Sequence, residues 1–125
     1  MIFAPLAAVA LIVSVATAPV VEPRGAAAQM SISQKNAAMQ PLVRSATECI
    51  ARTVAADPRL HHADLGDLIV DSMPPCIGSV RAMIDTYDRY FGAGAGEAFF
   101  MGPYLDVLPR AVDKWIADDD ASAHP

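Results

Sequence analysis

After residue 40 the apolar side chains recur at three- and four-residue spacing, which is the pattern of an amphipathic helix. The first stripe predicts a helix that begins at Pro41 and ends at Asp57-Pro58. Proline suits the first helical position, because the backbone N–H that it lacks is not needed there. The polar residues before it, 29–40, predict an N-terminal arm or an early helical turn. The stripe consists of Leu42, Val43, Ala46, Cys49, Ile50, Thr53 and Val54.

A second, shorter helix is expected after Asp64, whose side chain is suited to cap the first turn. Pro74 and Pro75 should end this helix, because a residue that precedes proline is pushed out of the α conformation. The same prolines suit the start of a third helix, which would end at Gly92, a natural C-terminal cap. The two stripes are Leu65, Leu68, Ile69 and Met73, and then Ile77, Val80, Met83, Ile84, Tyr87 and Phe91.

The last part of the chain begins with a flexible glycine-rich loop, 92–96, followed by a helical turn over 97–101. A final helix is expected from Gly102-Pro103, with a kink or break at Pro109, which cannot donate a backbone hydrogen bond. No run alternates with period two, so the sequence predicts an all-α domain, a small irregular bundle of about four helices. The final stripe is Tyr104, Leu105, Leu108, Val112, Trp115 and Ile116.

Residues 1–28 are predicted to be a signal peptide. An uncharged apolar run, 2–15, has the length of a signal-peptide core and is short for a membrane-spanning helix. Small residues permit cleavage after Ala18 or Ala28, and Pro19 disfavours the first site. No Lys or Arg precedes Arg24, so an uncleaved membrane anchor is the alternative. We expect a periplasmic or secreted protein.

The helical domain is expected to span 41–118, followed by an acidic disordered tail, 119–125.

The charge of the chain limits the partners that it can bind. The formal net charge is -5, and cleavage after Ala28 leaves it unchanged because Glu22 and Arg24 are lost together. This charge repels nucleic-acid phosphates and anionic lipid, and no basic cluster offsets it. We therefore expect no nucleic-acid binding and no stable membrane association after signal cleavage.

Cys49 and Cys76 are the only 2 cysteines of the chain. In an oxidising compartment an even number of cysteines favours a disulfide, which would join the first expected helix to the third. The alternative is a reactive thiol at Cys76, because a cysteine at a helix N-terminus has a lowered pKa. No C-x-x-C motif or assigned base supports that alternative, so we expect a structural disulfide.

Two segments could hold a small ligand. His61 and His62, with Asp64 and Asp67 close behind, could bind a metal, although adjacent histidines point apart and no spaced metal motif is present. The loop 92–96, with its glycines Gly92, Gly94 and Gly96, could cover a pocket, but no Lys follows as in a phosphate-binding loop. The main interpretation is that His61 and His62 lie in a solvated loop and that the segment 92–96 is a simple connector. No catalytic motif occurs, so we expect neither an enzyme nor a cofactor.

All aromatic side chains after residue 28 lie between Tyr87 and Trp115. Part of this segment could form an exposed patch that binds a protein partner, because a small domain buries few large rings. The simpler interpretation is that most of these rings form the core. The candidate patch is Phe99, Phe100, Met101 and Tyr104.

In architecture alone the chain resembles small exported helical proteins with one disulfide, such as periplasmic acid chaperones and the immunity proteins that cap secreted toxins. No sequence motif accompanies this resemblance, and a fold does not define a function. We expect an interaction module that binds an unidentified protein. The alternative is a carrier of a metal or small ligand that uses His61 and His62 or a pocket near the loop 92–96.

Intact-mass measurement of the exported protein tests both N-terminal processing and the disulfide. We expect a chain that begins at Gln29 and a mass lower by two hydrogen atoms than that of the reduced protein. Two thiols that react with an alkylating agent in the untreated native protein would contradict the disulfide, and a mass that retains residues 2–15 would support the anchor.

Overall fold

The computed structural model describes residues 29–123, and this part of the chain is helical with connecting turns and contains no strand. The predicted all-α class is confirmed for these residues, whereas the predicted signal peptide, 1–28, lies outside them. No helix in the described range has the length and apolar character required to cross a bilayer. The elements are α2 (Ile32–Ala55), α3 (Leu65–Phe91), α4 (Ala95–Phe99), the π-helix η1 (Phe100–Tyr104) and α5 (Leu105–Ala123).

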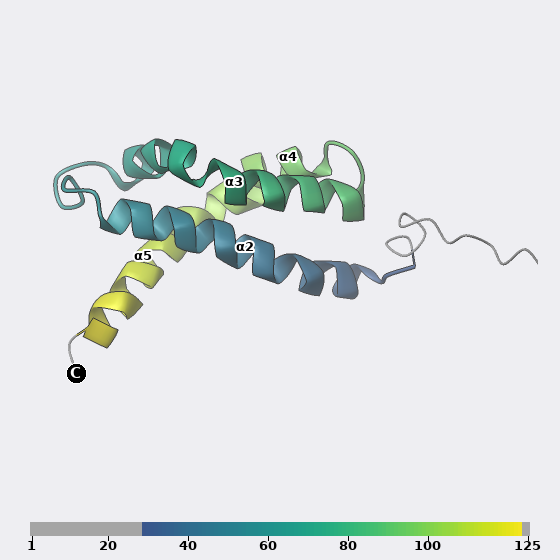
Figure 1. Ribbon diagram of the computed structural model, residues 1–125, viewed down its shortest axis with the longest axis horizontal. Helices are drawn as coiled ribbons and strands as arrows, with labels where there is room; N and C mark the ends of the chain where they lie inside the picture. The colour runs from purple at the N-terminus through teal and green to yellow at the C-terminus, as the bar shows by residue number, and fades with distance from the viewer. Residues whose placement is uncertain (1–28, 124–125) are drawn as a thin grey trace, which may run out of the picture.

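Helix α2 is the common partner of the other long helices. It runs antiparallel to α3 along most of its length, and α5 crosses behind it in the view of Figure 1. Helices α3 and α5 touch each other much less than either touches α2. The last turns of α5 extend away from the α2–α3 pair (Figure 1). The fold is therefore a pair of antiparallel helices crossed by a third.

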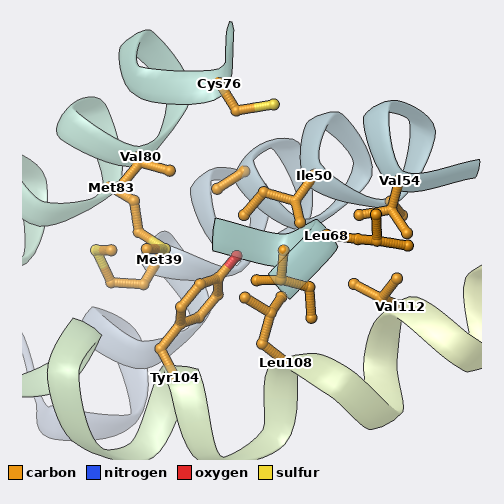
Figure 2. Packing of buried hydrophobic residues seen from close by; sticks show 13 residues of the cluster. Met39, Ile50, Val54, Leu68, Cys76, Val80, Met83, Tyr104, Leu108 and Val112 are labelled. Carbon is orange, nitrogen blue, oxygen red and sulfur yellow. The ribbon is translucent and has the colours of Figure 1, made fainter. Parts of the chain in front are cut away.

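The core consists of the apolar stripes that α2, α3 and α5 turn toward one another. Ile50 and Ala46 of α2 and Val112 of α5 have no exposed surface, as the periodic pattern predicts. Figure 2 shows Tyr104 reaching into this core, with Met39 and Met83 on one side and Leu108 on the other. The buried apolar residues are Met39, Ala46, Ile50, Ala51, Val54, Leu68, Ile69, Cys76, Val80, Met83, Tyr104, Leu108 and Val112.

Helix α2 begins at Ile32, so most of the expected polar arm, 29–40, is helical. A capping box at Ser31 explains this start, because its side chain accepts a hydrogen bond from the Gln34 N–H at 3.1 Å. In return the Gln34 side chain accepts from the Ser31 N–H at 2.8 Å. Pro41 therefore lies inside the helix instead of at its first position, and it is exposed, so that water can reach the backbone beside it.

The expected break at Pro74 and Pro75 is wrong, because α3 continues through both residues. The bundle consequently has three long helices, and not about four. Both rings are exposed, and the carbonyls that lose their partners belong to exposed residues one turn earlier. The ribbon of α3 is drawn out and bent in this region (Figure 1), as prolines inside a helix cause. Leu68 before the bend and Cys76 after it belong to one core, which keeps the helix together.

The chain is helical from Ala95 to Ala123, with a wide turn at η1. The Leu105 N–H donates to the Phe100 carbonyl, five residues earlier, which is the π-helical pattern. Of the kink or break expected at Pro109, the break is absent, because α5 continues through this exposed residue, which removes only one hydrogen bond. The expected disordered tail is also helical as far as Ala123.

Cys49 and Cys76 form a disulfide with a Cα–Cα distance of 5.8 Å, which confirms the predicted pairing. The bond joins the C-terminal third of α2 to α3, directly after the proline pair. Because α3 begins at Leu65, Cys76 lies in a helix interior and not at a helix N-terminus, so the alternative of a thiol activated by a helix start is wrong.

We expect loss of the disulfide to lower the free energy of unfolding by about 3.5 kcal/mol, because the bond restricts the unfolded chain over a separation of 27 residues. Urea denaturation of the Cys49→Ala, Cys76→Ala double variant measures this change. The reduced wild-type protein is the matched control and should lose a similar amount. An unchanged urea midpoint in both proteins would show that the bond does not stabilise the fold.

Candidate functional site

The aromatic segment predicted to bind a partner is largely packed into the protein. Tyr104 is 3% exposed and belongs to the core, so it does not contribute to a surface patch. Phe99 is half-buried and stacks on Tyr87, with ring centroids 4.5 Å apart. Phe100 is half-buried and stacks on Tyr104 at 5.7 Å. Only Met101 of the four candidates is well exposed, at 62%.

The hydroxyl group of Tyr104 has a structural role. The Thr47 hydroxyl donates to the Val43 carbonyl at 2.7 Å, so the Thr47 oxygen is free to accept from the Tyr104 hydroxyl at 3.0 Å. Burial raises the pKa of Tyr104, and the hydrogen bond to Thr47 offsets part of this rise. The contact connects η1 to α2 and satisfies a buried polar atom.

The candidate metal ligands His61 and His62 lie in the turn between α2 and α3, and both are exposed. Two of the nearby carboxylates, Asp64 and Asp71, already have partners. Asp64 caps α3, as predicted, by accepting a hydrogen bond from the Gly66 N–H. The guanidinium of Arg59 binds the Asp71 carboxylate at 2.8 Å. Within residues 29–123 no three His, Cys, Asp or Glu side chains are placed to hold a metal ion.

The loop 92–96 reverses the chain tightly onto α3. Gly92 ends α3 as predicted, with φ of 109°, and Gly94 has φ of 86°, conformations that favour glycine. Gly96 is buried so closely against α3 that an added Cβ would collide with the Ile84 carbonyl. Its N–H donates to Asp88 Oδ1 at 2.7 Å, so this carboxylate occupies the position that an anion would take in a phosphate loop. The space beneath Gly96 is thus filled by α3.

An exposed apolar line on α3 was not predicted from the sequence. Val70, Pro74 and Ile77 are spaced to lie on one side of the helix, and we call them the α3 stripe. Val70 is 66% and Ile77 47% exposed. Ile77 was expected to face the core, but Cys76 and Val80 take the buried positions there. The spacing becomes visible in the sequence only once α3 is known to continue through its prolines.

A groove between α2 and α5 was also not predicted from the sequence. It is open to solvent and has a volume of about 550 Å³. Its residues repeat at three- and four-residue spacing on each helix, but the sequence does not say which faces of the two helices meet. The lining consists of Gln40, Val43, Arg44, Thr47 and Glu48 from α2, and Ala111, Lys114 and Trp115 from α5.

No known protein family, curated protein or solved structure matches the chain. The surface features that could bind a partner or ligand are the α3 stripe and the groove between α2 and α5.

Substitution of Gly96 tests how closely the loop packs on α3. We expect Gly96→Ala to lower the free energy of unfolding by about 2 kcal/mol, because the new methyl group meets the Ile84 carbonyl. Gly78→Ala is the matched control, since nothing lies within 4 Å of its added Cβ, and it should stabilise α3 by up to about 1 kcal/mol. Urea denaturation measures both, and equal effects of the two substitutions would contradict close packing at Gly96.

Proposed function

We propose that the protein is an exported interaction module that binds another protein through the α3 stripe, in the periplasm or outside the cell. The observation that carries this proposal is the exposure of two large apolar side chains, Val70 at 66% and Ile77 at 47%, along one side of a helix. Export is supported by the apolar N-terminal run, and it is consistent with an intramolecular disulfide.

The position of the stripe favours binding. Ile77 directly follows Cys76, which is bonded to α2, so the backbone beneath the stripe is already fixed before a partner arrives. A surface ordered in advance loses little conformational entropy on association. Each apolar side chain that a partner covers contributes roughly 1–2 kcal/mol.

The residues around the stripe indicate the chemistry of the partner. Asp67 and Arg81 are exposed one turn beyond either end of the stripe, so an apolar centre has charged residues at its rim. The complementary surface is an apolar groove or helix face with a cation opposite Asp67 and an anion opposite Arg81.

Site-specific photo-crosslinking in exporting cells tests the proposal. With p-benzoyl-phenylalanine in place of Ile77, we expect one dominant protein adduct. The control places the same residue at Val107, which is 57% exposed on α5 and outside the stripe. Val107 should give no such adduct. The same adducts from both positions would contradict a binding site on α3.

Affinity measurements with the purified partner then test the stripe itself. Val70→Asp and Ile77→Asp should each weaken binding about 10-fold or more, because each places a charge in an apolar contact. Val107→Asp is the control and should leave the affinity unchanged. Since all three side chains are exposed, the urea midpoints should shift little. Unchanged affinity of both stripe variants would overturn the proposal.

A further inference from the structure

The groove between α2 and α5 has an aromatic wall. Trp115 lines it and is the 1 tryptophan of the chain. The indole is half-buried and packs against the core, which holds it in place. Val43 and Ala111 extend the apolar lining on the two helices. A volume of about 550 Å³ is within the range of small-molecule sites.

Two cations line the same groove. Arg44 and Lys114 are both exposed, and within the described residues neither forms a salt bridge. The one carboxylate in the lining, Glu48, lies 3.5 Å from Arg52, a cation outside the groove. The lining therefore has one excess positive charge, from two cations and one carboxylate, on a protein whose net charge is -5. This local reversal of charge favours an anion.

We propose that the groove binds a small organic anion with a planar apolar body. Its ring lies against Trp115, and its acid group lies beside Arg44 and Lys114. The guanidinium of Arg44 suits a carboxylate in particular, because its planar donors match the two oxygens. The volume fits one small molecule. This site is on α2 and α5, so it is independent of the α3 stripe.

The shape and charges of the groove set the strength of binding. An open groove covers a ligand on one side only, so we expect a Kd between about 10 μM and 1 mM. The two cations are exposed, so salt screens their attraction for the acid group. Binding should accordingly weaken several-fold between 20 mM and 500 mM NaCl.

The single tryptophan provides a direct measurement. In a nitrogen-15 spectrum the protein has one indole N–H signal, from Trp115. Titration with 1-naphthoate should move this signal saturably. The neutral analogue 1-naphthalenemethanol should bind at least 10-fold more weakly, and the cationic 1-naphthylmethylamine more weakly still. Equal affinities of the three compounds, or no movement of the signal, would overturn the proposal.

Substitutions locate the charge contacts. Arg44→Gln and Lys114→Gln should each weaken naphthoate binding about 5-fold, and the double variant should remove the preference for the acid over the alcohol. Arg110→Gln, an exposed cation on α5 outside the lining, should leave binding unchanged. Thermal unfolding confirms that the variants remain folded. An unaltered preference in the folded double variant would overturn the proposal, as would tighter binding of an acidic peptide than of naphthoate.

Discussion

The disulfide between Cys49 and Cys76 fixes α3 on α2 at the place where α3 is weakest, directly after two prolines. A helix with that sequence would not persist alone, because consecutive prolines remove two backbone hydrogen bonds. Here the buried residues on either side of the bend share one core with α2. The same helix α2 receives α5 on another face, so both candidate surfaces depend on this one pair of helices.

The helical stripes could be predicted because burial follows the 3.6-residue period, and Ala46, Ile50 and Val112 are buried as that period requires. The continuation of α3 through Pro74 and Pro75 could not be predicted, because the tendency of proline to break a helix is local whereas the packing that overrides it is tertiary. The early start of α2 is a different case. Its signal, a serine followed three residues later by glutamine, is present in the sequence.

Candidate sites were harder to predict than helices. Tyr104 is an aromatic residue near a loop, and only the neighbouring α2 makes it a buried hydrogen-bonding residue. The groove requires residues from α2 and α5 to face each other across a crossing that no periodicity specifies. Exposure of Ile77 likewise depends on which side of α3 meets α2. Sequence patterns give the faces of each helix, and packing decides which of those faces remain available.

The wide turn at η1 sets the rotation of everything that follows it. The bond from the Leu105 N–H to the Phe100 carbonyl spans one residue more than an α-helical bond. In an α-helix one residue corresponds to a rotation of about 100°. This added residue therefore acts as a phase shift between the aromatic segment and α5. It rotates the stripe that begins with Tyr104 and Leu108, which are four residues apart and so share one helical face, toward the core.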